Sequence, residues 1–397
     1  MADPITAQQV EADPRLWRAS WDGQLLEDLS GGVLGGSVSH DLSRAQHWSL
    51  DCTLHYDAWE YLRPFVDWVA PVMNLRYPDG SVISQQLGLY CVLDSPEQRE
   101  ELSGTVRLDA RDVLWAVNAQ GTKAPIQVTG GNFGAQAKAV LNSASVPGGL
   151  PTSRFRQTIP DFTVPIRADT YRGFPVNSRM VAVINEFLAT GKHYPMYSNQ
   201  LGIIGSHPIT PLIDKAPLRS WYANPPNAQI YIGEDLINLA PFVGQQSPII
   251  GAVDTSPGSA DLYDQIIVVG GVGGATPIRG TASLADFFGG GGAAGSVVSG
   301  TSQTISLPMV ASNADAEAIA MAILEEMLTK NTTISLTVKP DPRFVAIHDV
   351  VRLGIWDLRG REVALGKFLV KRVQYGMTVD NPLMKVDLGA LSDAVPI

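Results

Sequence analysis

The side chains best able to do chemistry are scattered along this chain. Six histidines and two cysteines occur, at His40, His47, His55, His193, His207, His348, Cys52 and Cys91. No two histidines have the i, i+4 spacing with a glutamate that marks a zinc hydrolase helix. The cysteines stand far apart and have no Cys-x-x-Cys partner, which argues against structural zinc. We therefore expect no metal ion.

Motifs for nucleophiles and cofactors are equally weak. No Gly-x-Ser-x-Gly turn occurs, so the nucleophile elbow of the α/β-hydrolases is absent. The run Gly270-Gly271-Val272-Gly273-Gly274 follows an apolar strand, as the glycine loop of a dinucleotide site does. However, no helix pattern follows it, and Pro277 stands where the helix should begin. We interpret the run as a turn and expect no cofactor.

Carboxylates, tryptophans and arginines leave more room for alternatives. The pairs Glu100-Glu101 and Glu325-Glu326 are typical of solvated charge, but two glycosidase carboxylates need only meet in space. The eight tryptophans favour core or interface positions over sugar-binding platforms; they are Trp17, Trp21, Trp48, Trp59, Trp68, Trp115, Trp221 and Trp356. One locally basic segment is either a solvated loop or an interface loop, with Arg154, Arg156, Arg167 and Arg172. We predict no catalytic residue.

Composition places the chain among globular proteins of two or three domains. It has 397 residues, of which 45% are hydrophobic and 17% are charged. The net charge of −10 disfavours binding of nucleic acid through its phosphates. Cys52 and Cys91 both lie in apolar strand patterns, which favours buried free thiols over a disulfide. Because neither a signal peptide nor a membrane-length apolar window is visible, we expect a soluble chain made in the cytosol.

The first part of the chain is mostly β. Residues 1–13 are polar and are predicted to form an arm, and residues 14–115 a first barrel-like domain. In this domain Leu50, Cys52 and Leu54 alternate with polar residues, the period of a half-buried strand. Pro78-Asp79-Gly80 is a typical hairpin turn.

The middle of the chain mixes helices and strands. Residues 116–265 are predicted as an α/β region, with one helix ending near Asn142 and another from Ser178 to Ala189 that Gly191 ends. Residues 266–311 are predicted as a strand followed by a glycine-rich loop at Gly289–Gly300.

The last part, residues 312–397, begins with an amphipathic helix. Ser312 is its expected cap, and the apolar stripe includes Ile319, Ile323 and Met327. Short strands follow, starting with the alternation around Leu336. We predict a second small barrel with this helix packed on it. The fold class is therefore α+β, mainly β, with two small barrel-like domains and an α/β middle region.

Several segments, taken in order, resemble the baseplate hub or minor tail proteins of long-tailed bacteriophages. They are Trp48–Leu54, Leu87–Pro96, Val106–Leu114, Val183–Leu188, Tyr194–Gly202, Asp264–Gly270 and Asp349-Val350-Val351. At the last segment the chain has His348 where the family pattern has glycine before the aspartate.

The resemblance implies a structural protein of the virion, located at the tail tip and synthesised in the host cytoplasm. Family members form a homotrimeric ring in which two barrels per subunit alternate around a channel with pseudo-sixfold symmetry. The implied partners are the distal tail or tail-tube protein, other tail-tip or fibre proteins and the tape measure protein. DNA would pass during genome ejection without specific binding. The chain ends just past the second barrel, so we expect no enzymatic extension.

Two other functions stay open at this stage. One is a tail-associated cell-wall hydrolase, and the other is a module that binds the host receptor. For the ring, the acidic composition further predicts a negative channel wall that DNA passes without binding.

Overall fold

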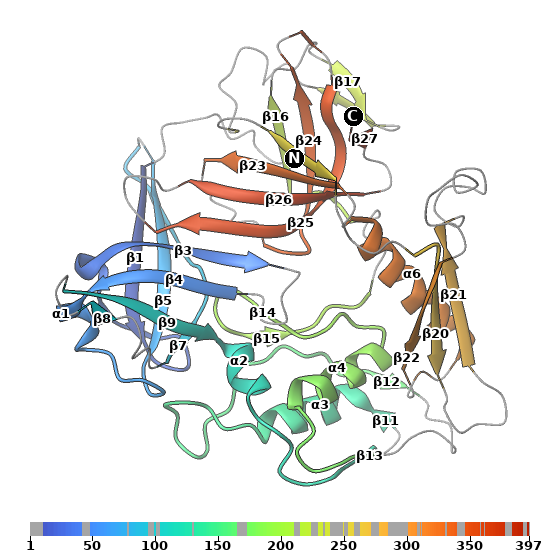
Figure 1. Ribbon diagram of the computed structural model, residues 1–397, viewed down its shortest axis with the longest axis horizontal. Helices are drawn as coiled ribbons and strands as arrows, with labels where there is room; N and C mark the ends of the chain where they lie inside the picture. Colours follow the sequence, from blue (N-terminus) through green and yellow to red (C-terminus); the bar gives the residue numbers. More distant parts are fainter. Residues whose placement is uncertain are drawn as a thin grey trace.

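The fold is built mainly from strands (Figure 1). The computed structural model describes residues 11–41, 48–77, 79–93, 99–100, 104–128, 131–164, 173–209, 215–223, 229–232, 235–238, 249, 253–257, 263–270, 278–284, 301–307, 310, 312–329, 332–339, 346–357, 359–360, 362–377, 383–391 and 395–396. The predicted class, α+β and mainly β, is confirmed. Of the predicted arm, Glu11–Asp13 instead belong to the first strand, and the remaining residues lie outside the described part.

Eight strands form one continuous antiparallel run, in which each strand pairs with the next. In spatial order they are β8 (Arg99–Glu100), β9 (Thr105–Asp112), β4 (Trp48–His55), β3 (Val33–Asp41), β25 (Glu362–Gly376), β26 (Met384–Ala390), β23 (Thr332–Val338) and β19 (Asp254–Pro257). The first four include the sheet of the predicted first barrel, and the next three belong to the predicted second barrel. The two barrels therefore share one sheet.

The remaining strands of each half complete its barrel-like shape. In the first half they are β1 (Glu11–Ala19), β2 (Leu25–Asp28), β5 (Trp68–Arg76), β6 (Val82–Gln86) and β7 (Tyr90–Val92), with η1 (Ser30–Gly32) and α1 (Tyr56–Trp59). In the second half they are β16 (Arg219–Ala223), β24 (Val350–Trp356) and β27 (Val395–Pro396). Although β16 lies in the predicted middle region, it pairs in parallel with β24. The second half thus recruits a strand from outside residues 312–397.

One hydrophobic core lies beneath both halves. Val38 on β3 is paired with Tyr375 on β25, and both side chains are buried. Phe368, Leu54 and Leu388 belong to the same cluster. Burial of this alternating face explains why strands far apart in the sequence are held in one register.

The middle region has a separate core around three helices. These are α2 (Val113–Asn118), α3 (Phe133–Asn142) and α4 (Met180–Thr190). The last two match the predicted helices. Short hairpins surround them, formed by β10 (Ile126–Gln127) with β13 (Gly173–Phe174), β11 (Gly131–Asn132) with β12 (Thr163–Val164), and β14 (Tyr197–Ser198) with β15 (Ile204–Gly205). A further hairpin joins β17 (Gln229–Ile232) and β18 (Asp235–Asn238).

The helix predicted to brace the second barrel packs mainly on another sheet and touches the second half at β26. Helix α6 (Asn313–Thr329) lies on a three-stranded sheet of β20 (Gln265–Gly270), β21 (Ile278–Ser283) and β22 (Ser302–Ser306) (Figure 1). A Cβ atom on Gly280 of β21 would lie 2.0 Å from the backbone nitrogen of Glu317, so helix and strand are in backbone contact. Ser312 caps the helix as predicted, because its Oγ accepts from Asp315 N at 3.1 Å. The sequence therefore predicted which face of α6 is apolar, but not which sheet this face packs against.

Candidate functional site

The eight-strand run has one buried face and one polar face. On β9, Arg107, Asp109 and Arg111 alternate with buried Val106, Leu108 and Ala110. Side chains of directly paired residues lie on the same side, so rows of polar residues cross the sheet. We call this side the polar face. Its members on β9 to β23 are Arg107, Asp109, Arg111, Ser49, Asp51, Thr53, Ser37, Ser39, Asp41, Arg372, Gln374, Lys385, Asp387, Thr333, Ser335 and Thr337.

One row of paired residues runs without interruption through both halves. It contains Arg111, Ser49, Ser39, Gln374, Lys385 and Thr337, in that order. The Oγ atoms of Ser39 and Ser49 are 2.7 Å apart, and Gln374 Nε2 donates to Ser37 Oγ at 2.9 Å across the junction of β3 and β25. The two halves are therefore joined by side chains as well as by main-chain pairing.

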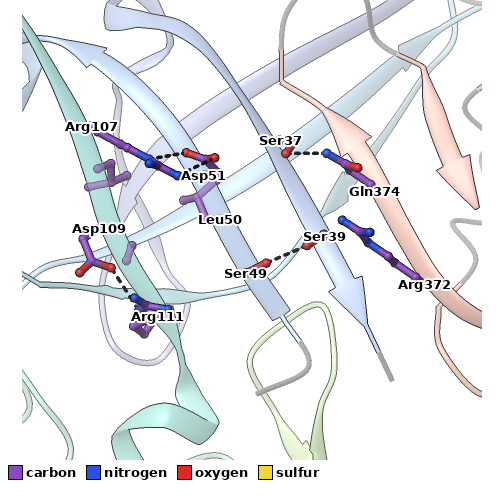
Figure 2. A pocket seen from close by; sticks show the side chains of 12 residues that line it. Ser37, Ser39, Ser49, Leu50, Asp51, Arg107, Asp109, Arg111, Arg372 and Gln374 are labelled. Carbon is purple, nitrogen blue, oxygen red and sulfur yellow. Dashed lines mark hydrogen bonds and ion pairs between the residues drawn. The ribbon is translucent and has the colours of Figure 1, made fainter. Parts of the chain in front are cut away.

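A hollow of about 500 Å³ lies on the polar face over β9, β4, β3 and β25 (Figure 2). Arg107 donates from Nε and Nη2 to the two oxygens of Asp51, each at 2.9 Å. Arg111 Nε lies 3.1 Å from Asp109 Oδ1, and Arg372 Nε lies 4.0 Å from Asp41 Oδ2. These pairs are partly exposed, so each adds at most about 1 kcal/mol to stability. The hollow has the character of a charged, hydroxyl-rich wall rather than an enclosed apolar ligand pocket.

The polar face carries charges of both signs. At the paired positions from β9 to β23 it carries four cations, Arg107, Arg111, Arg372 and Lys385, and four carboxylates, Asp41, Asp51, Asp109 and Asp387. Lys371 at the bulge of β25 and Asp254 on β19 add one charge of each sign. The net charge of the whole chain therefore does not describe this face, because acidic residues lie elsewhere.

A connecting segment, described at residues 192–209 and 215–223, contacts both halves and α6. At the first half, Trp48 Nε1 donates to the Ser198 carbonyl at 2.8 Å, and Ser198 Oγ donates to Asp112 Oδ2 at 3.3 Å. His40 stacks on Trp48 with ring centroids 3.9 Å apart. Toward α6, Lys192 forms an ion pair with Asp315.

Asp112 is the buried carboxyl group of this junction. It caps α2 by accepting from Trp115 N at 3.0 Å, and burial raises its pKa to about 6. The folded protein therefore holds a proton on Asp112 at a pH where the unfolded chain, with a pKa near 3.8, has released it.

We expect this group to lower stability as pH rises from about 4 to about 6. The loss amounts to about 3 kcal/mol, since one pKa unit corresponds to about 1.4 kcal/mol. Asp112→Asn keeps a capping oxygen and has no titrating proton, so its unfolding free energy should lack this decrease. The measurement is urea denaturation of both proteins at several pH values. A difference between them that is independent of pH would contradict the assignment.

The connecting segment reaches the second half at His348. Lys215 Nζ donates to the His348 carbonyl, Leu218 N donates to the Val350 carbonyl at 2.7 Å, and Tyr194 stacks on the His348 ring at 5.1 Å. His348 has φ +66°, a left-handed conformation that favours glycine. This explains why a glycine suits the position, and the stacking and backbone contacts show how histidine is held there.

The other described histidines contact aromatic rings or a carboxylate. His193 stacks on Phe162 at 4.7 Å, and His207 Nε2 shares a hydrogen bond of 2.5 Å with the Tyr197 hydroxyl. Burial lowers the pKa of both histidines. His55 Nδ1 lies 3.3 Å from Asp57, and His47 lies outside the described residues. Across the described part of the chain, no group of three or more His, Cys, Asp or Glu side chains is arranged to hold a metal ion.

The cysteine prediction is confirmed, and one carboxylate prediction is wrong. Cys52 and Cys91 are buried free thiols, and burial raises the pKa of each to about 12. Glu325, predicted to be solvated, is only 7% exposed because it lies on the packed side of α6. The side chains of Glu100, Glu101 and Glu326 are outside the described part.

Tryptophans and arginines divide between core, surface and undescribed positions. Trp48, Trp68, Trp221 and Trp356 are buried, as predicted for core residues. Arg156 donates to the Leu201 carbonyl, whereas Arg154 donates to the nearby Pro151 and Ser153 carbonyls. The predicted basic segment therefore does not act as one patch in its described part; Arg167, Arg172, the glycine run after Gly270 and the loop Gly289–Gly300 lie outside it.

Sequence reasoning missed the polar face as a unit and the connecting segment. The alternation on β4 and β9 signalled polar outer residues, but no signal in the chain indicated that β25 lies beside β3. None of the described helices combines the length and apolar character needed to cross a membrane.

Comparisons with known proteins identify the fold. No protein-family model matches the sequence, and no curated protein matches it either. Three solved structures are similar over nearly their whole length. A tail protein from Neisseria meningitidis MC58 has a TM-score of 0.57 and 9% identity, covering 95% of this chain and 97% of that one.

The other two are also tail proteins. The 43 kDa tail protein of prophage MuSo2 from Shewanella oneidensis has a TM-score of 0.55 and 10% identity, with coverage of 96% and 99%. The prophage tail protein gp18 from Listeria monocytogenes EGD-e has a TM-score of 0.51 and 11% identity, with coverage of 95% of each chain. At such low identity the likeness concerns architecture alone. This chain has the fold of phage tail proteins.

Proposed function

We propose that the protein is a structural component of a phage tail tip, in which three copies form a ring around a channel for DNA. The observation that carries this proposal is the pairing of β3 with β25 over five residue pairs, which makes one sheet from two barrel halves. The fold shared with phage tail proteins supports the same setting.

The strand directions of the eight-strand run favour a closed ring. Every neighbouring pair is antiparallel, so directions alternate along the run. The first four strands, β8 to β3, therefore have the same order of directions as the last four, β25 to β19. Because of this equivalence, β19 of one copy can pair antiparallel with β8 of the next copy. This pairing would have the same geometry as the pairing of β3 with β25 within one copy. Among the described residues, β8 pairs only with β9, and β19 only with β23.

The polar face supplies the inner wall of such a ring. The opposite face of the run is buried against the hydrophobic core. The shared core of both halves lies on that side, where the circumference of a ring is larger. Only the polar side chains are left to line a water-filled channel.

The proposed partners follow from this placement in the virion. One rim of the ring would meet the distal tail or tail-tube protein and the other would meet tip or fibre proteins, with the tape measure protein inside before ejection. The role is structural: the arginines of the hollow form ion pairs with carboxylates, and Ser39, Ser49 and Gln374 form cross-strand contacts that hold a wall together.

We expect cross-linking between copies to reveal the ring. Arg99→Cys on β8 with Asp254→Cys on β19, joined by a short bis-maleimide, should give a ladder that stops at three copies. Asp161→Cys on the middle region replaces Arg99→Cys in a control pair that should give no ladder. Buried Cys52 and Cys91 should stay unreactive.

A reconstruction of the tail tip supplies the second measurement. Three copies with β19 beside β8 of a neighbour are expected. Six copies in one ring, or a tip without this chain, would contradict the proposal.

A further inference from the structure

The polar face contains the groups that normally bind DNA. Arginine side chains bind phosphates through paired N–H donors, and each such contact releases counterions. Arg107 and Arg111 lie on β9 and Arg372 lies on β25, so they are spread over both halves (Figure 2). Three copies in a ring would multiply these contacts, and a wall of free arginines would retain DNA.

Each arginine is instead accompanied by a carboxylate. Asp51 accepts both 2.9 Å hydrogen bonds from Arg107 and is contributed by the neighbouring strand. Asp109 binds Arg111 at 3.1 Å, and Asp41 lies 4.0 Å from Arg372 across the junction of the halves. The donors of Arg107 and Arg111 that would contact a phosphate are thus directed at carboxylates of the same wall, whereas Arg372 has only the longer ion pair with Asp41.

The remaining charged residues of the face are two carboxylates, Asp254 and Asp387, and two lysines, Lys371 and the exposed Lys385. Asp387 on β26 is the strand-register partner of Arg372, on the side of β25 opposite Asp41. Its Oδ1 accepts a hydrogen bond from Ser335 at 2.7 Å. Lys371, at the bulge in β25, donates to Thr333 Oγ1 at 2.8 Å, and Asp254 on β19 lies opposite Ser335. Serines and threonines fill the other positions, and no aromatic side chain offers a stacking platform for bases at the described outward positions.

We propose that the polar face is a charge-masked guide for double-stranded DNA, in which Asp51 and Asp109 occupy Arg107 and Arg111, the arginines that would otherwise hold its phosphates, and Asp41 offsets the charge of Arg372. This inference rests on the proposed function, because it assumes that the face lines the DNA path. A phosphate must displace a carboxylate that is already in place, so the gain per contact is small. The arginines can therefore tie strands together without slowing the DNA.

The test removes the masking carboxylates and leaves the arginines. Full-length Asp51→Asn/Asp109→Asn is compared with the unmodified chain for binding to a duplex DNA by fluorescence anisotropy from 50 to 200 mM salt. We expect the variant to bind at least about tenfold more tightly at 50 mM salt. Its log–log salt dependence should steepen by about two per copy, close to the value for two additional phosphate contacts.

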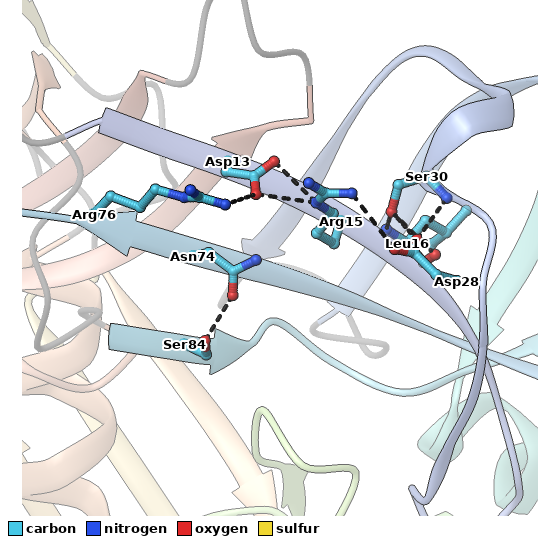
Figure 3. Close-up of polar contacts among 8 residues, drawn as sticks. All are labelled: Asp13, Arg15, Leu16, Asp28, Ser30, Asn74, Arg76 and Ser84. Carbon is cyan, nitrogen blue, oxygen red and sulfur yellow. Dashed lines mark hydrogen bonds and ion pairs between the residues drawn. The ribbon is translucent and has the colours of Figure 1, made fainter. Parts of the chain in front are cut away.

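Two controls separate masking from a general change in charge. Asp13→Asn/Asp161→Asn removes the same two charges away from the face, where Asp13 pairs with Arg15 and Arg76 on β1 and β5 (Figure 3) and Asp161 pairs with Lys138. It should bind DNA like the unmodified chain. Adding Arg107→Gln and Arg111→Gln to the test variant should abolish its gain.

Two results would overturn the inference: a test variant that binds no better than the Asp13/Asp161 control, or an unmodified chain that already binds with the salt dependence of several phosphate contacts. The mass of each sample is measured in parallel. Failure to form a three-copy ring would show in that mass whatever the DNA result, so the two failures are distinguishable.

Discussion

Replacing Trp48 with alanine is expected to lower the free energy of unfolding by about 5 kcal/mol. The side chain is only 2% exposed and stacks on His40, so its removal leaves a large cavity between β4 and the connecting segment. The Ser198 carbonyl also loses its 2.8 Å hydrogen bond in a buried position. Urea denaturation followed by circular dichroism measures the effect.

A conservative variant separates the two contributions. Trp48→Phe fills most of the space but lacks the indole N–H, so we expect a loss of about 1–3 kcal/mol. Trp21→Phe, at a tryptophan that is only half-buried, is the control and should change stability by less than about 1 kcal/mol. Equal losses for Trp48→Phe and Trp48→Ala would show that the hydrogen bond, not packing, dominates this junction.

Gly148→Ala is expected to cost about 2–5 kcal/mol and to loosen the middle region from the first half. Gly148 has φ +70°, and a Cβ atom there would lie 1.9 Å from the Val66 carbonyl oxygen. The strained backbone contributes about 1–2 kcal/mol and the forced separation of the two loops about 1–3 kcal/mol. The adjacent bond from Trp68 Nε1 to the Pro147 carbonyl, 2.9 Å long, should weaken as the loops separate.

Gly80→Ala is the matched control for this change. Gly80 has φ +85° in the β5–β6 turn, but a Cβ atom there would meet nothing within 4 Å. It should therefore show only the backbone cost of about 1–2 kcal/mol. Hydrogen exchange of the Trp68 indole should increase in Gly148→Ala and not in Gly80→Ala. Similar losses of stability in both variants would mean that the loop contact is unimportant.

Local features of this chain were predictable because they depend on neighbouring residues. The alternation in β4, the helices α3 and α4 and the Ser312 cap follow from periodicity and capping chemistry over a few residues. The buried thiols follow from the apolar strands around Cys52 and Cys91. For the candidate site, the same alternation indicated polar outer residues on individual strands.

Long-range pairings were not predictable in the same way. Main-chain hydrogen bonds between β3 and β25 involve groups that every residue carries, so no side-chain pattern specifies that the two strands meet. The stripe of α6 likewise suits any apolar surface, and the backbone contact at Gly280 selects the small sheet of β20 to β22. The sequence has His348 where the family pattern has glycine, and its φ of +66° shows that this position requires a left-handed backbone conformation.

The sequence alone determined the mainly β class, the positions of the principal helices and the buried state of both cysteines. The tertiary structure alone decided that two barrel halves share one sheet, that α6 packs mainly on the small sheet of β20 to β22, and that the polar face is balanced in charge. The physical reason is the range of each interaction. Periodicity and capping act within one element, whereas strand pairing and the pairing of Arg107 with Asp51 depend on segments brought together by burial of a common core.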